Sequence, residues 1–124
     1  MEIERLHKML TDAGIPHEWR DRTPPSYSAM RCQLQEEHPI KWGWQIIVYE
    51  KNGDRMISAI EGYGSYGFGN FLQGYDEKYG DLIEIMGLLT DEEALNDTVV
   101  GWLTAEEVFR RIKEAWDERN IRNS

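Results

Sequence analysis

The stretch EGYGSYGFGNFLQGY, Glu61 to Tyr75, is the part of this sequence that comes nearest to a chemical motif. It holds five glycines and five aromatic rings in fifteen residues, and Gly62, Gly64 and Gly67 give the spacing G-x-G-x-x-G. Glycines in this spacing let backbone N–H groups approach a phosphate when they follow a strand and open a helix. A phosphate-binding loop is therefore the first hypothesis to test.

The sequence around these glycines does not support a nucleotide-binding enzyme. Phe68-Gly69-Asn70 and Gly74 are poor material for a helix, because each glycine costs about 1 kcal/mol relative to alanine. The segment GYGSYGFG resembles the glycine-rich loop of protein kinases over about eight residues, but the lysine, catalytic-loop and D-F-G motifs of a kinase are missing. There is also no G-K-[ST] of a P-loop.

Three structural roles remain open for this stretch. It can be a compact loop whose rings pack on its own domain, a platform that stacks a nucleobase, or a protein-binding hot spot rich in tyrosine. The candidate residues for ligand or partner binding are its polar and aromatic side chains and the two acids that follow. They are Tyr63, Ser65, Tyr66, Phe68, Asn70, Tyr75, Asp76 and Glu77.

Negative charge is concentrated in the second half of the chain. The net charge is -9 at pH 7; residues 1–60 carry 9 acids and 8 bases, whereas residues 61–124 carry 14 acids and 6 bases. Most of this excess lies in the segment from Asp76 to Asp97, where eight acids accompany Lys78 alone. Such a field repels nucleic acid and anionic membranes and attracts a basic surface on another protein. We therefore expect no direct contact with DNA or RNA.

The basic residues offer one further candidate site. Strands could gather Arg20, Arg22, Arg31, Lys41 and Arg55 near the tyrosine-rich loop, and Arg31 or Arg55 would then contact an anionic ligand. The alternative is ordinary charge on the surface of strands.

No metal, cofactor or catalytic group is expected. His7, His17 and His38 are scattered without an i, i+4 pair, which predicts ordinary surface histidines. Cys32 is the single cysteine and is read as a small buried apolar residue, and there is no G-x-S-x-G motif. The sequence therefore predicts a protein that is not an enzyme, although a small enzyme of unknown class remains a third alternative.

Strand signals fill the middle of the chain. Trp44 to Glu50 and Arg55 to Glu61 flank Asn52-Gly53, which predicts a hairpin with a tight type I′ turn. A short strand is expected over His17 to Asp21, and the alternation of apolar and polar residues in Ala29 to Gln35 predicts a half-buried strand.

Helical patterns lie at both ends. Apolar residues at helical spacing predict a helix over Met1 to Ala13, and an apolar run predicts a short helix over Asp81 to Leu88. Helix Ala105 to Arg119 carries an apolar stripe. Two capping boxes are expected, Thr90 with Glu93 and Thr104 with Glu107.

Together these signals predict one α+β domain over residues 1–124. We expect an antiparallel sheet of three to four strands with the N- and C-terminal helices packed on one face. The chain has no apolar run long enough to span a membrane and no recognisable signal peptide, so a cytoplasmic location is expected. A homo-oligomer would give so small a chain a deeper pocket.

Three stretches resemble small phage and prophage accessory proteins of gut Firmicutes. They are MEIERLHKMLTDAGIPHEW, DLIEIMGLLTDEE and VVGWLTAEEVFRRI, together 46 of the 124 residues. The resemblance implies a protein that acts by binding, in the cytoplasm of a bacterial host. It leads to the hypothesis of an antagonist of antiphage defence that binds a host or defence protein through the acidic segment and the Gly/Tyr-rich loop. The alternative is a module that sequesters a nucleotide signal.

Overall fold

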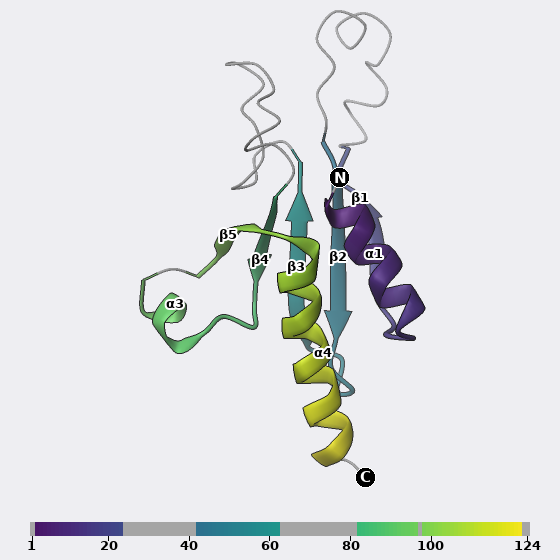
Figure 1. Cartoon of the computed structure of the whole chain (residues 1–124), viewed down its shortest axis with the longest axis vertical. Helices are drawn as coiled ribbons and strands as arrows, with labels where there is room; N and C mark the ends of the chain where they lie inside the picture. Colours follow the sequence, from purple (N-terminus) through teal and green to yellow (C-terminus); the bar gives the residue numbers. More distant parts are fainter. Residues whose placement is uncertain (1, 24–41, 63–81, 97, 123–124) are drawn as a thin grey trace, which may run out of the picture.

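The computed structural model describes residues 2–23, 42–62, 82–96 and 98–122. Its elements, in chain order, are α1 (Glu2–Asp12), β1 (Glu18–Asp21), β2 (Trp44–Tyr49), β3 (Arg55–Glu61), β4 (Ile83–Met86), α3 (Asp91–Asn96), β5 (Val100–Leu103) and α4 (Ala105–Arg122). The strands form one antiparallel sheet in the order β1-β2-β3-β4-β5, and α1 and α4 cover one of its faces (Figure 1). The predicted α+β fold is confirmed, with five strands in place of three to four.

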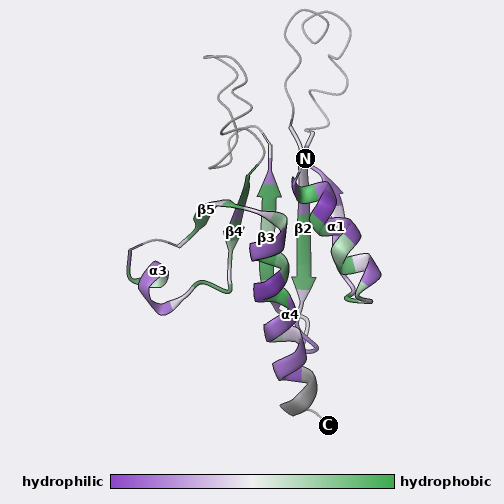
Figure 2. Ribbon diagram, in the orientation of Figure 1, coloured by the Kyte–Doolittle hydropathy of each residue, from purple (hydrophilic) through white to green (hydrophobic). Residues whose placement is uncertain are grey.

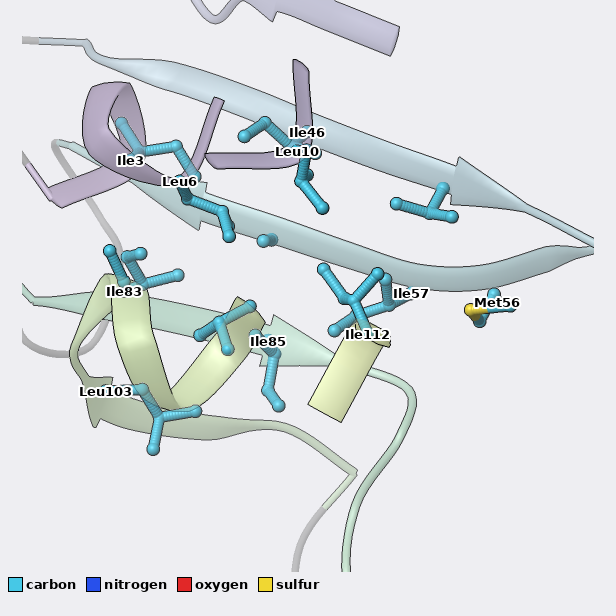
Figure 3. Packing of buried hydrophobic residues seen from close by; sticks show 14 of the residues in the cluster. Ile3, Leu6, Leu10, Ile46, Met56, Ile57, Ile83, Ile85, Leu103 and Ile112 are labelled. Carbon is cyan, nitrogen blue, oxygen red and sulfur yellow. The ribbon is translucent and has the colours of Figure 1, made fainter. Parts of the chain in front are cut away.

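The hydrophobic core lies between this face of the sheet and the two helices (Figure 3). The predicted apolar stripes of α1 and α4 both face it, while the outer sides of these helices are hydrophilic (Figure 2). The side chains of this core that are fully withdrawn from solvent come from both helices and three strands. They are Ile3, Leu6, Leu10, Ile46, Val48, Ala59, Ile83, Ile85, Ala105, Val108 and Ile112.

The helix predicted over Asp81 to Leu88 is wrong, because this part of the chain forms β4. Its apolar residues satisfy a helical spacing, but Ile83 and Ile85 also alternate with Glu84 and Met86, as they must in a strand with one buried face. Antiparallel pairing with β3 on one side and β5 on the other decides between the two. Tertiary pairing therefore overrides the local pattern. The strand predicted over residues 29–35, with Cys32, lies outside the described residues.

The predicted β2–β3 hairpin is confirmed, but its turn differs from the type I′ turn expected. Type I′ needs a positive φ at both central residues. Here Gly53 has a φ of 92°, and Asn52 is not among the residues with positive φ. The Gly53 N–H donates to the Glu50 carbonyl at 2.9 Å, and the Glu50 N–H donates to the Asp54 carbonyl at 2.7 Å. The loop is therefore one residue longer than a two-residue type I′ loop. Lys51 and Asn52 are the central residues of the turn, and Gly53 follows them.

A β-bulge near this turn changes the direction of side chains along β3. Val48 pairs with Ile57, but the next residue of β2, Tyr49, pairs with Arg55. Met56 is therefore an extra residue of β3 at this point. Met56 and Ile57 both enter the core as a result. A bulge of this kind reverses the in-and-out alternation of the strand beyond it. Arg55 and Ser58, three residues apart, consequently lie on the same face, opposite the helices.

Both long helices are capped at their first turn by carboxylates distant in the sequence. Glu61, which is fully buried, accepts a hydrogen bond from the Ile3 N–H at 3.2 Å. Glu2 accepts one from the Ala105 N–H at 2.8 Å. A carboxylate at a helix N-terminus satisfies an orphan donor and complements the helix dipole. The predicted capping boxes at Thr90 and Thr104 are also formed.

Stacked rings attach α1 to the edge of the sheet, contrary to the scattered surface histidines expected. His7 stacks on Trp19 with ring centroids 4.4 Å apart, and Trp19 stacks on Trp44 at 4.6 Å. His7 Nδ1 lies 2.7 Å from His17 Nε2, and His17 Nδ1 lies 2.9 Å from the Ile15 carbonyl oxygen. Because a carbonyl can only accept, His17 donates through Nδ1, and neutral His7 then donates through Nδ1 to His17. Within the described residues no group of three metal-ligating side chains occurs.

This pair predicts a loss of stability in mild acid. Burial, and after it the charge of His17, lowers the pKa of His7 below its ordinary value of about 6.5. In this range the unfolded chain binds more protons than the folded one, so stability is complete above the ordinary pKa and falls as the pH decreases below it. We expect the melting temperature to fall between about pH 7.5 and pH 5, and to fall less in His7→Phe, which keeps a ring on Trp19. An equal fall in both proteins would contradict this.

Among the described residues, no helix is both long and apolar enough to cross a membrane.

Candidate functional site

The structure describes one of the predicted site residues, Arg55, which begins β3. The other nine lie outside the described residues, and their binding roles stay predictions: Arg31, Tyr63, Ser65, Tyr66, Phe68, Asn70, Tyr75, Asp76 and Glu77. The nucleotide-sequestering alternative depends largely on these side chains. It too stays a prediction.

The structure explains why glycine is required at the first position of the G-x-G-x-x-G stretch, Gly62, without a role in phosphate binding. Gly62 has a φ of 141°, and a Cβ there would lie 2.6 Å from the Trp42 carbonyl carbon. Gly43, with a φ of 79°, faces it, and a Cβ there would lie 2.7 Å from the Glu61 carbonyl carbon. Two backbones therefore cross in van der Waals contact at the end of the β2–β3 pair, and only glycine fits on either side.

Most of the described part of the acidic segment lies in the connection between β4 and β5, whereas Glu84 belongs to β4 itself. We call residues 87–102, which are this connection and the greater part of β5, the acidic arm; residue 97 lies outside the described part. Figure 1 shows the short helix α3 of this arm to one side of the sheet. The arm is therefore presented beside the body of the protein.

An ion pair with α4 fixes the arm in place. The Arg111 guanidinium holds both oxygens of Glu93, at 2.8 and 3.0 Å, and donates to the Leu88 carbonyl at 3.1 Å. The Arg111 hydrogen bonds, and after them the Thr90 backbone N–H, lower the pKa of Glu93 to about 2. A bidentate pair of this kind restricts geometry as well as adding energy. Glu93 stays ionised in mild acid, so the attachment is maintained there.

The arm exposes large apolar side chains beside its acids. Helix α3 has no buried residue, and its Leu95 is 83% exposed; Trp102 in β5 is 56% exposed. Asp91 and Glu92 are exposed on the same helix. Single exposed apolar residues are common, but here two large ones lie on the same short arm, and exposed apolar side chains rimmed by polar groups can mark a protein-binding surface.

The backbone at Trp102 is strained. Its φ is 65°, in the left-handed region that bulky residues rarely adopt. Strain of this kind costs about 1–3 kcal/mol and is found mainly where function requires the conformation. The strained backbone at Trp102 coincides with an exposed indole in the arm.

A shallow groove lies on the opposite face of the sheet from the helices. Its volume is about 230 Å³, and it is lined by Gln45, Arg55, Ser58, Ile60, Glu84, Met86 and Val99. The registers Gln45–Ile60–Glu84 and Ser58–Met86 place most of these residues in two adjacent rows across β2, β3 and β4. The groove thus has a cation, a carboxylate, an amide and a hydroxyl among apolar side chains.

The described members of the predicted basic cluster do not form a basic patch. Arg20 pairs with Glu18 at 2.5 Å, and Arg22 donates to the Trp42 carbonyl at 2.9 Å. Glu18 also accepts from Tyr49, and this bond, followed by the one from Arg20, lowers the pKa of Glu18. The third described arginine of this cluster, Arg55, makes no hydrogen bond or ion pair within the part of the chain that the structure describes, and it interacts electrostatically with Glu18.

Comparison with protein-family models, curated proteins and solved structures gives no match for this chain.

Sequence reasoning missed several residues of these surfaces. Leu95 is the single large apolar residue of DEEALN, so the lack of an apolar stripe there could have revealed its exposure. Strand alternation predicts Gln45 and Ser58 on the face away from the core. The position of Arg55 could not be found in this way, because the bulge reverses the alternation between it and Ser58.

Proposed function

We propose that this chain is a non-enzymatic binding protein that captures a protein partner through its acidic arm. The observation that carries the proposal is the combination of exposed Leu95 and strained, exposed Trp102 with the carboxylates of α3. Tryptophan is among the residues that most often dominate interface energies, and the Arg111–Glu93 pair preorganises the arm that presents it. Preorganisation lowers the entropy lost on binding.

Charge selects the kind of partner. Asp91 and Glu92 extend into solvent on a chain with a net charge of -9. A second copy would bring the same acids against each other, and nucleic acid would bring phosphates. A protein with a basic surface and an apolar pocket for an indole is the complementary partner.

The resemblance to phage accessory proteins supports a biological setting for this partner. We infer that the chain acts in the cytoplasm of a bacterial host and antagonises an antiphage defence protein. The acidic arm would bind a basic surface of the defence protein, of the kind that attracts a negatively charged substrate or ligand, and would block access to it.

Plating of phage tests this role. We expect expression of the chain to restore plaque formation in a bacterial strain whose single defence system restricts the phage. Leu95→Asp and Trp102→Ala should lose the effect. Glu114→Gln, an exposed acid of α4, should keep it.

Purified proteins give the quantitative form of the test. Trp102→Ala should weaken binding to the sensitive defence protein by about 30-fold or more, the effect of removing a hot spot of 2 kcal/mol. Affinity should also decrease with added salt, because exposed charges are screened. Restoration by the arm variants equal to wild type, or no restoration in any strain of a broad panel, would overturn the proposal.

A further inference from the structure

The face of the sheet away from α1 and α4 is a second surface, and its rows of side chains lie outside the acidic arm. A central row, Trp19–Ile46–Ala59–Ile85, faces the helices, so the rows on either side of it face away from them. Both outward rows run across the same four strands, β1 to β4. They are Glu18–Ile47–Ser58–Met86 and Arg20–Gln45–Ile60–Glu84.

The middle of this face is open and partly apolar. Met86 is 57% exposed, Ile60 beside it on β3 is half-buried, and both line the groove of about 230 Å³. Within the described ranges, the two long helices pack on the other side of the sheet (Figure 1). A sheet is stabilised when its apolar face is covered by another layer. This face therefore has room for one more layer.

The charges of this face are balanced. The chain has a net charge of -9, but this face carries as many arginines as acids: Arg20, Arg55, Glu18 and Glu84. Glu18 pairs with Arg20 and interacts electrostatically with Arg55, while Glu84 interacts electrostatically with Arg22. A second copy of the chain therefore meets no excess of like charge here, in contrast to the acidic arm.

The two outward rows are also complementary to each other. Glu18 begins one row and Arg20 begins the other, both on the edge strand β1. A two-fold axis that runs across the strands between the rows sets each row opposite the other row of a second copy. The Glu18 carboxylate then faces the Arg20 guanidinium of the second copy, and Ser58 faces its Ile60. The side chains of Glu18 and Arg20 are 40% and 48% exposed, so both can reach across.

We propose that this face is the interface of a homodimer in which two sheets pack on each other with the helices outside. Aligned sheets pack about 10 Å apart with their strands within about 30° of each other. Met86 of each copy would then be covered by β4 of the other. The arginines and acids would enter the interface already paired, which avoids burying an uncompensated charge. This dimer does not depend on the partner proposed for the acidic arm.

The size of the face predicts a weak dimer. Strands β2 and β3 have 6 and 7 residues, and four strands about 4.8 Å apart with about 3.4 Å per residue give a face of about 400 Å². A standard interface takes about 800 Å² from each partner, so this one belongs with the weak complexes. We expect a dissociation constant of about 100 µM, with the monomer predominant in dilute solution.

Sedimentation velocity of the purified chain between about 10 µM and about 1 mM tests the dimer. The average mass should rise from 14.6 kDa toward twice that value. Met86→Glu places an unpaired charge in the interface and should weaken association at least about tenfold. Leu95→Asp, which changes an exposed residue of the acidic arm, should leave the dissociation constant unchanged.

An exchange of charges tests the arrangement of the rows. Arg20→Glu sets acid opposite acid and should weaken association at least about tenfold. Adding Glu18→Arg to this variant exchanges the two charges, so the rows are complementary again and the dimer should return. Circular dichroism checks that each variant is folded. A monomer at about 1 mM, an unchanged constant in Met86→Glu, loss of the dimer in Leu95→Asp, or no return in the exchanged variant would overturn the proposal.

Discussion

Gly43→Ala is expected to destabilise the protein by about 3 kcal/mol or more, the sum of a backbone overlap and a disfavoured φ. A Cβ at this position would meet the Glu61 carbonyl group and, at 2.8 Å, the Gly62 Cα, all of which are backbone atoms. Neither strand can move away without breaking the β2–β3 pairing that continues from this crossing. Urea unfolding followed by tryptophan fluorescence measures the change.

Gly53→Ala is the matched control for this substitution. Gly53 has a φ of 92°, as unfavourable for alanine as that of Gly43, but no atom lies within 4 Å of a Cβ there. Its cost should be only the conformational one, about 1 kcal/mol. Equal costs at the two positions would mean that the close crossing contributes nothing.

Leu6→Ala is expected to cost between about 2 and 5 kcal/mol. Leu6 is fully buried in α1, in the core cluster that includes Ile3 and Leu10 of the same helix (Figure 3). Removing its branched end leaves a cavity bounded by the sheet and α4, elements that cannot collapse inward without losing their own packing. For a chain of this size the melting temperature should fall by about 4 °C per kcal/mol.

Lys8→Ala on the same helix separates burial from helix propensity. Lys8 is exposed, and alanine is at least as favourable as lysine in a helix. Its effect should remain within about 0.5 kcal/mol. A cost at Leu6 no larger than this would show that α1 is not held by the core.

Elements with local signals could be predicted from the sequence. The β2–β3 hairpin has two β-rich runs around Asn52-Gly53, and the capping boxes at Thr90 and Thr104 each place both partners within three residues. The stripes of α1 and α4 are long enough for their period to be read. In these cases the interactions that stabilise an element are contained in the element.

Features that depend on distant partners could not be predicted. The residues of β4 fit a helix or a strand, and only β3 and β5 decide between them. His7 and His17 meet because α1 turns back along β1, and Glu61 reaches the start of α1 from the end of β3. The groove depends on a bulge that no local pattern marks. Such contacts become visible only when the strand order is known.

The sheet joins strands in the order in which the chain presents them, but α1 contacts α4. During synthesis on the ribosome, the hairpins can pair as soon as they emerge, whereas the N-terminal helix must wait for the last helix before its interface is complete. Glu2 and Arg5, which bind Ala105 and Glu106, are translated about a hundred residues before their partners. Until then the apolar side of α1 lacks part of its cover, so nascent chains that stall before α4 should be the principal clients of chaperones and proteases.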